Sequence, residues 1–134
     1  MYGKKNSVGG RGRAMVRRSE LLLNFLKALS SNRYSDAERI ISILERRMRS
    51  RGDWGRGYTT ALRGLLSAKK AGDKHAFHLS LNDDPRRLKE LRREFSSHSR
   101  AACHADFDRG YFAALKELVS TALKAHQAQK PSTV

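Results

Sequence analysis

The sequence predicts an all-α fold: a compact helical domain of about five helices, with an internal duplication of a helix-turn-helix hairpin and a flexible basic N-terminal arm. Apolar residues recur at the three- and four-residue spacing of amphipathic helices along most of the chain. No segment shows sustained period-two alternation, so strands are not expected. Two sixteen-residue segments of the chain also resemble each other closely. We therefore divide the chain into a basic arm (1–15), a single helical domain (16–126) and a polar tail (127–134).

The internal repeat is the most informative feature of the chain. Residues 53–68 read DWGRGYTTALRGLLSA and residues 106–121 read DFDRGYFAALKELVST. Similarity this dense indicates a duplicated structural unit, and we place the two pseudo-repeats at about 34–70 and 84–125. Only the second helix of each unit is convincingly duplicated. The identical pairs are Asp53/Asp106, Arg56/Arg109, Gly57/Gly110, Tyr58/Tyr111, Ala61/Ala114, Leu62/Leu115, Leu65/Leu118 and Ser67/Ser120.

The N-terminal arm is expected to lack a fold of its own. Its first thirteen residues contain four glycines, four cations and no acidic residue, a composition that buries too little apolar surface to fold alone. The GGRGR run favours a segment that orders along a nucleic-acid backbone, and an ordinary frayed terminus is the alternative for the first few residues. The four cations are Lys4, Lys5, Arg11 and Arg13.

The first two expected helices are identified by their apolar stripes. The first begins near Ser19 and stops at residues 30–32. The second is expected to begin with Ser35 as its N-cap and Glu38 as the capping-box partner, and to end near residues 51–52. Their core-facing residues are Leu22, Leu23, Phe25, Leu26 and Leu29, then Ala37, Ile40, Ile41, Leu44 and Met48.

Three further helices and one irregular segment follow. Asp53 opens the third helix, which runs through Lys70 and is closed by Gly72. Residues 73–81 form a short helix or turn carrying Phe77 and Leu81. Asp84 and Pro85 are a start signal for a helix to about residue 97, because proline is favoured at the first helical position. The last helix runs from about 106 to 126.

The repeated glycines predict a close helix crossing. Gly57 and Gly110 lie one turn into their helices, where glycine costs about 1 kcal/mol relative to alanine. Close approach of a second backbone would offset that cost, so we expect the two duplicated helices to cross at their glycines. The aromatic and aliphatic residues of the repeat are interpreted as core rather than as a base-stacking platform.

Charge indicates the class of partner. The chain contains 28 Lys and Arg against 13 Asp and Glu, a formal net charge of +15. Such an excess opposes the compact state by self-repulsion, so a polyanionic partner is the natural explanation. The 18 arginines outnumber the 10 lysines, and guanidinium pairs with phosphate in bidentate fashion and stacks on bases.

The preferred phosphate-binding surface combines the arm with cations of the first three helices. Arg56 and Arg109 have a rival role, as partners of Asp53 and Asp106 at the helix starts. Cations at positions 86, 87, 92 and 93 are expected instead to form ion pairs with neighbouring acidic residues. The proposed contacts are Lys4, Lys5, Arg11, Arg13, Arg17, Arg18, Arg46, Arg47, Arg49, Arg51, Arg56, Arg63 and Lys70.

No catalytic or cofactor motif is present. The chain has no phosphate-cradling glycine loop, no dinucleotide fingerprint and no HExxH sequence. His98, Cys103, His104, Asp106 and Asp108 are the only clustered metal-capable residues, but they lack paired-ligand spacing, so neither a metal nor another cofactor is expected. We therefore expect a protein without enzymatic activity.

The sequence thus favours non-catalytic binding of structured RNA by a ribosomal or ribosome-associated protein, with ribosomal RNA as partner and ribosomal proteins as neighbours. A DNA-binding architectural or regulatory protein is the first alternative, because phosphates are alike in both nucleic acids. A helical protein-interaction module is the second. The single cysteine and the lack of an apolar span predict a cytoplasmic protein without a membrane partner.

Overall fold

The computed structural model describes residues 16–129, and it is helical with no strand in that range. The elements are α2 (Arg18–Ser30), α3 (Tyr34–Met48), the 3₁₀ turn η1 (Arg49–Arg51), α4 (Gly52–Ala71), α5 (Pro85–Arg100) and α6 (Asp106–Gln129). The all-α class is therefore confirmed. The last helix, expected to end at about residue 126, continues to Gln129. Lys4, Lys5, Arg11 and Arg13 lie outside the described residues.

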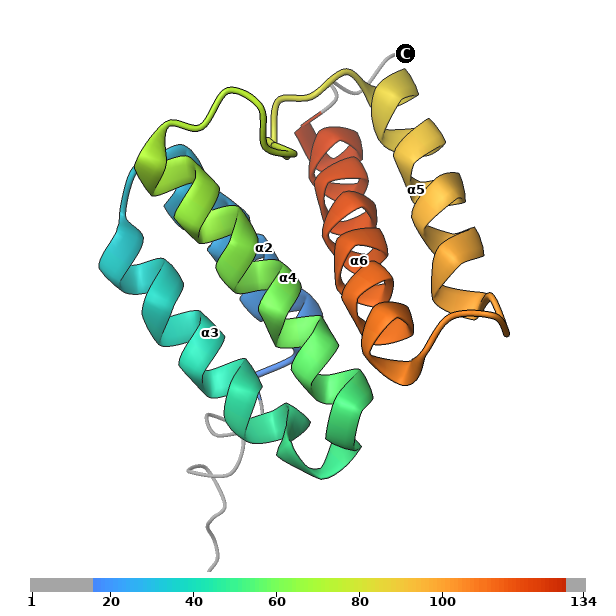
Figure 1. Cartoon of the computed structure of the whole chain (residues 1–134). Helices are drawn as coiled ribbons and strands as arrows, with labels where there is room; N and C mark the ends of the chain where they lie inside the picture. The colour runs from blue at the N-terminus through green and yellow to red at the C-terminus, as the bar shows by residue number, and fades with distance from the viewer. Residues whose placement is uncertain (1–15, 130–134) are drawn as a thin grey trace, which may run out of the picture.

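Two helical hairpins lie side by side, and α2 packs behind them (Figure 1). Helix α3 is antiparallel to α4, and α5 is antiparallel to α6 (Figure 1). The hairpins meet along α4 and α6, while α2 contacts α3 and α6. Helices α3 and α5 consequently lie on opposite flanks of the molecule (Figure 1).

The α2–α3 connection differs from the predicted capping box. Asn32 adopts a left-handed conformation (φ 59°), and the Arg33 N–H donates to the Ala28 carbonyl at 2.8 Å. This bond closes α2 in the manner of a Schellman turn. Arg33 is already the N-cap residue of α3, with no side-chain cap. Ser35 therefore lies inside the first turn, and the expected Ser35–Glu38 capping box is wrong.

The C-terminal end of α4 agrees with the prediction, and the N-terminal end does not. At the C-terminal end Gly72 is left-handed (φ 64°), and the Asp73 N–H donates to the Ala68 carbonyl, so glycine closes the helix as expected. At the N-terminal end Arg51 is the N-cap residue, without a side-chain cap. Asp53 lies within the first turn, where its charge favours the helix dipole but caps nothing.

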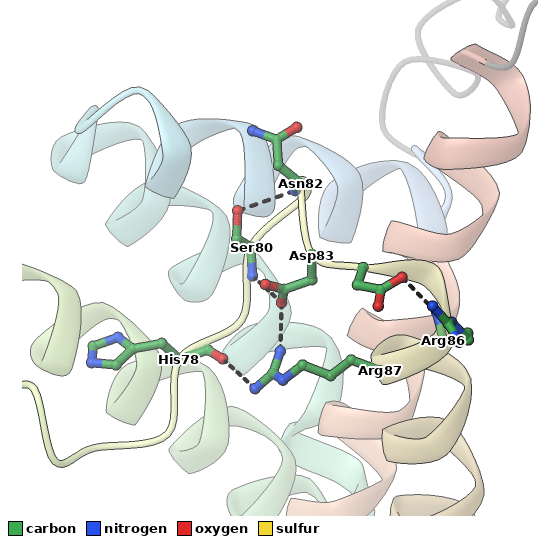
Figure 2. A network of polar contacts seen from close by, with 7 residues as sticks. His78, Ser80, Asn82, Asp83, Arg86 and Arg87 are labelled. Carbon is green, nitrogen blue, oxygen red and sulfur yellow. Dashed lines mark hydrogen bonds and ion pairs between the residues drawn. The ribbon is translucent and has the colours of Figure 1, made fainter.

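The segment between α4 and α5 is irregular rather than helical. Asp83 fixes it, because its carboxylate accepts from the Ser80 N–H at 2.9 Å and from Arg87 at 2.7 Å (Figure 2). Arg87 also donates to the His78 carbonyl at 3.2 Å. Leu79 is the residue that this segment buries, whereas Phe77 remains exposed and Leu81 is half-buried.

Helix α5 begins as the sequence predicts. Asp84 is its N-cap residue and accepts from the Arg86 N–H at 3.2 Å, and Pro85 occupies the first helical position. Proline lacks the N–H that would have no partner there. The helix continues three residues beyond the predicted end, to Arg100.

The predicted glycine crossing is confirmed. A Cβ on Gly57 would lie 1.9 Å from the Phe107 carbonyl oxygen, and one on Gly110 would lie 1.9 Å from the Trp54 carbonyl oxygen. The contact is reciprocal, since Trp54 and Phe107 are themselves equivalent positions of the repeat. The absence of two side chains thus lets α4 and α6 touch backbone to backbone near their N-terminal ends.

The repeated helices supply much of the core beyond this crossing. The aliphatic positions of the repeat are buried in both copies, but Tyr58 is fully buried while Tyr111 is half-buried. The sequence interpretation of this face as core is confirmed for those aliphatic positions. They are Ala61, Leu62, Leu65, Ala114, Leu115 and Leu118.

Candidate nucleic-acid interface

Five of the predicted contacts gather at one end of the helix bundle. Because α2 and α3 are antiparallel, the start of α2 lies at the same end as the last turn of α3 and the η1 turn (Figure 1). We call this surface the basic end. All five side chains are exposed, and they are Arg17, Arg46, Arg47, Arg49 and Arg51.

The local fold explains how the basic end is presented. Arg46 and Arg47 belong to the last turn of α3, where cations interact favourably with the negative end of the helix dipole. The chain then tightens into η1 and turns at Gly52 (φ 58°), a conformation that glycine adopts without strain. The turn holds Arg49 and Arg51 beside the α3 cations.

Arg51 is ordered by an aromatic neighbour. Its guanidinium lies 4.1 Å from the centroid of the Trp54 ring, a cation–π arrangement. Trp54 in turn stacks on Tyr58, with ring centroids 5.4 Å apart. The half-buried indole therefore connects this arginine to the core without neutralising its charge.

Arg56 and Arg109 are placed in the rival role. Arg56 lies 2.5 Å from Asp53, and Arg109 pairs with Asp106. Each pair spans three residues in the first turns of α4 and α6, at equivalent positions of the repeat. Arg109 also donates to the Ala101 carbonyl. A carboxylate beside each guanidinium weakens its attraction for phosphate, so these two arginines fit helix starts better than nucleic-acid contacts.

Arg63 and Lys70 connect α3 to α4. Arg63 donates two hydrogen bonds to Glu45, at 2.6 and 2.8 Å, and Lys70 lies 3.6 Å from Glu38. The hydrogen bond from Arg63 lowers the pKa of Glu45, and the nearby Arg49 charge adds to the effect. Both predicted contacts therefore already have an acidic partner on the neighbouring helix.

Arg18 belongs to a polar group at the α2–α6 contact. Glu117 on α6 accepts from the Tyr58 hydroxyl at 2.5 Å and pairs with Arg18 at 3.2 Å. Burial raises the pKa of Tyr58 well above its ordinary value, and the Glu117 charge adds to the shift. The arrangement thus fixes a protonated hydroxyl in the core and ties α2 to α6.

An open groove of about 800 Å³ runs beside this group, between α2 and α6. Arg17, Arg18 and Lys124 line it together with Glu20 and Glu117, so its walls carry both cations and carboxylates. The mixed charge does not define a phosphate site.

Helix α5 carries cations that sequence reasoning assigned to ion pairs. Only Arg87 is paired, with Asp83. Within the described part of the chain, Arg86, Arg92 and Arg93 form no ion pair, and neither do Glu90 and Glu94. The expected compensation along α5 is therefore wrong for these residues. The spacing of the α5 cations places several of them on one face of the helix, and this spacing was the sequence signal for an unpaired basic surface.

The histidine cluster contains no metal-binding arrangement. His98 Nδ1 lies 3.1 Å from His104 Nε2, and His98 stacks on Phe112 with centroids 4.6 Å apart. Cys103 is exposed, and Asp106 is paired with Arg109. Across residues 16–129, no three His, Cys, Asp or Glu side chains converge where a metal ion could bind.

No helix within residues 16–129 is long and apolar enough to cross a membrane.

Comparison with other proteins adds no identity. No protein family, curated protein or solved structure matches the chain. The functional argument therefore depends on the distribution of its charges.

Proposed function

We propose that this protein binds structured RNA without catalysis, through phosphate contacts made by the basic end. The proposal rests on one observation: some of the predicted contacts have acidic partners, and others have none among the described residues. Arg56, Arg63 and Lys70 have acidic partners, whereas Arg46, Arg49 and Arg51 are exposed and form no ion pair with any described residue. Unpaired guanidinium groups on neighbouring turns are well suited to a phosphate backbone.

Structured RNA is favoured because of how these arginines are presented. They project from a rigid helix end and a tight turn, which suits the shape and backbone of a folded RNA more than the reading of bases. Association with ribosomal particles in the cytoplasm is the cellular setting that we propose. Selectivity between sequences should be modest.

The test measures binding of a labelled RNA hairpin across a series of salt concentrations. Affinity should fall steeply, with a log–log slope of roughly −0.7 to −0.9 for each phosphate contact. The triple variant Arg46→Gln, Arg49→Gln, Arg51→Gln should bind more weakly and reduce the slope by about two to three units. A DNA duplex of matched sequence should compete less well than the RNA.

A matched control removes three charges at the opposite end of the bundle. Lys27, Lys69 and Lys74 are exposed at the ends of α2 and α4 and in the following loop. Their replacement by glutamine should change the slope less than the basic-end variant does. An equal loss in both variants would refute a localised interface, and affinity independent of salt would favour a protein partner. Equal competition by DNA would remove the assignment to RNA.

The cellular setting is tested separately on a sucrose gradient of lysate. Migration with ribosomal particles that is lost after ribonuclease treatment is the expected result. Migration with genomic DNA would contradict it.

A further inference from the structure

Four cations form a straight row on the outward face of α5, which we call the α5 stripe: Arg86, Lys89, Arg93 and Arg100. All four are exposed, while Leu88 and Phe95 on the opposite face are buried. With about 100° between successive helical residues, the four cations fall within an arc of roughly 60°. With a rise of 1.5 Å per residue, the row is about 21 Å long.

The α5 stripe keeps its charge because its neighbours do not neutralise it. Among residues 16–129 none of its members forms an ion pair, and Arg100 donates only to the hydroxyl of Ser96. Arg87 is not part of the row, and it donates hydrogen bonds to Asp83 and to the His78 carbonyl (Figure 2). Glu90 and Glu94 lie beside the row on the same helix but pair with none of its cations.

Helix α3, the equivalent of α5 in the first hairpin, differs from α5 in how its charged residues are paired. Helix α3 presents Glu45 and Glu38 to Arg63 and Lys70 of α4, so cations there are tied between helices. Helix α5 forms no such pair with α6 in the described residues. The two hairpins therefore share a packing arrangement but not a charge arrangement, and packing does not require the α5 cations.

The α5 stripe is separated from the basic end by the width of the bundle. Helix α5 packs against α6, on the flank opposite α3, with α4 and α6 between them (Figure 1). A double helix is stiff on this length scale. A straight duplex that lies along the length of the α5 stripe therefore has α6 and α4 between it and α3.

We propose that the α5 stripe is a second phosphate-binding surface, and that the protein uses it and the basic end to join two RNA duplex segments. The inference rests on the proposed function, since the basic end holds the first segment. Contacts from a row of Arg and Lys to phosphates fix position without reading sequence. The second segment is therefore recognised as a backbone.

The experiment uses the full chain and two identical RNA duplexes, one carrying a donor and the other an acceptor fluorophore. Binding of a single duplex is measured in parallel by anisotropy. The wild-type protein should bring donor and acceptor together at low protein-to-RNA ratios, and the signal should fall again when protein is in excess. The variant Arg86→Gln, Lys89→Gln, Arg93→Gln should lose most of the transfer, at least five-fold, while its affinity for one duplex falls less than three-fold.

The Lys27, Lys69 and Lys74 triple variant is the charge-matched control and should retain the transfer. Wild-type protein that binds one duplex but shows no transfer would overturn the bridging inference and leave the proposed function standing. Protein that binds no duplex even at low salt would overturn the proposed function. Transfer that persists in the α5 variant, or that occurs with DNA duplexes only, would also overturn the inference. So would a wild-type dimer that the α5 substitutions dissolve, because two copies with one site each would then explain the transfer.

Discussion

At the residue scale, Gly57 and Gly110 show why one hydrogen atom in place of a methyl group decides the arrangement of two hairpins. A Cβ added at either position would lie 1.9 Å from a carbonyl oxygen of the other helix, much closer than van der Waals contact allows. The obstacle is backbone, so no rotamer change can relieve it. The glycines are thus required by the crossing, which offsets their unfavourable helix propensity.

Gly57→Ala and Gly110→Ala should each destabilise the protein on the order of 3 kcal/mol, at the upper end of overpacking costs, because α4 and α6 must separate. Denaturant unfolding measures the effect. Gly64→Ala is the matched control: Gly64 is in the same helix as Gly57, and nothing lies within 4 Å of the added Cβ. It should stabilise by about 0.5–1 kcal/mol. Similar effects of all three substitutions would refute the crossing.

Tyr58 gives a second prediction at this scale. Its pKa is raised chiefly by burial and then by the Glu117 carboxylate. A raised folded-state pKa means that the stabilisation is complete below the ordinary tyrosine pKa of about 10 and declines as the pH rises above it. Stability should therefore fall more steeply above about pH 10 in the wild type than in Tyr58→Phe.

Two measurements check the Tyr58 prediction. At neutral pH the phenylalanine variant should lose about 1.5–3 kcal/mol, the contribution of a hydrogen bond to a charged group. Native Tyr58→Phe should also show the same phenolate absorbance as native wild type just above pH 10. A smaller absorbance in the variant would mean that Tyr58 ionises in the folded protein.

At the element scale, the sequence predicted a helix end correctly where the capping residue acts on its immediate neighbours in the chain. Asp84 and Pro85 cap α5, and Gly72 closes α4, because each acts within a few residues of its own position. Ser35 did not cap α3, because the left-handed turn at Asn32 starts that helix earlier. The similarity of the two segments predicted the glycine contact across 53 residues, because a glycine occurs at the same position in both of them.

Contacts between elements explain why only part of the candidate site was predictable. Arg63 finds Glu45 eighteen residues away, on another helix. No periodicity within α4 identifies that partner. Conversely, nearby acidic residues on α5 suggested ion pairs that side-chain geometry does not make. Which cations remain available for phosphate therefore depends on the tertiary arrangement.

Acid should weaken the α3–α4 contact. Because Arg63 lowers the pKa of Glu45, the stabilisation is present above the ordinary glutamate pKa of about 4.3 and is lost as the pH falls through the lowered value. Both side chains are more than a third exposed, so solvent screening limits the pair to about 0.5 kcal/mol. Glu45→Gln should destabilise by that amount at pH 7 and by little near pH 2.

Urea midpoints at the two pH values measure the difference. Glu20→Gln provides the control, since Glu20 is exposed and pairs with no described residue. It should not reproduce the loss at pH 7. Identical behaviour of the two variants at both pH values would contradict a specific Glu45–Arg63 contribution.

At the scale of the whole molecule, a net charge of +15 on 134 residues opposes folding and favours a polyanion at the same time. The acidic residues that do form ion pairs are concentrated at helix starts and between helices, as at Asp53, Glu45 and Glu117. They secure the fold locally. Other cations form no ion pair with any described residue, and two groups of them stand out: Arg46, Arg49 and Arg51 at the basic end, and the α5 stripe.

Salt should consequently act on stability and binding in opposite directions. Raising salt from about 0.02 M to 0.3 M shortens the screening length from roughly 20 Å to 6 Å, which weakens repulsion between the basic end and the α5 stripe. The melting temperature of the free protein should therefore rise by several degrees, although its exposed ion pairs are weakened. Over the same range RNA affinity should fall steeply. The melting temperature, followed by circular dichroism, should rise less with salt in the variant Arg86→Gln, Lys89→Gln, Arg93→Gln, because less repulsion remains to be screened. A melting temperature that falls with salt would show that ion pairs outweigh the unpaired cations, and a phosphate-binding role for those cations would lose its physical basis.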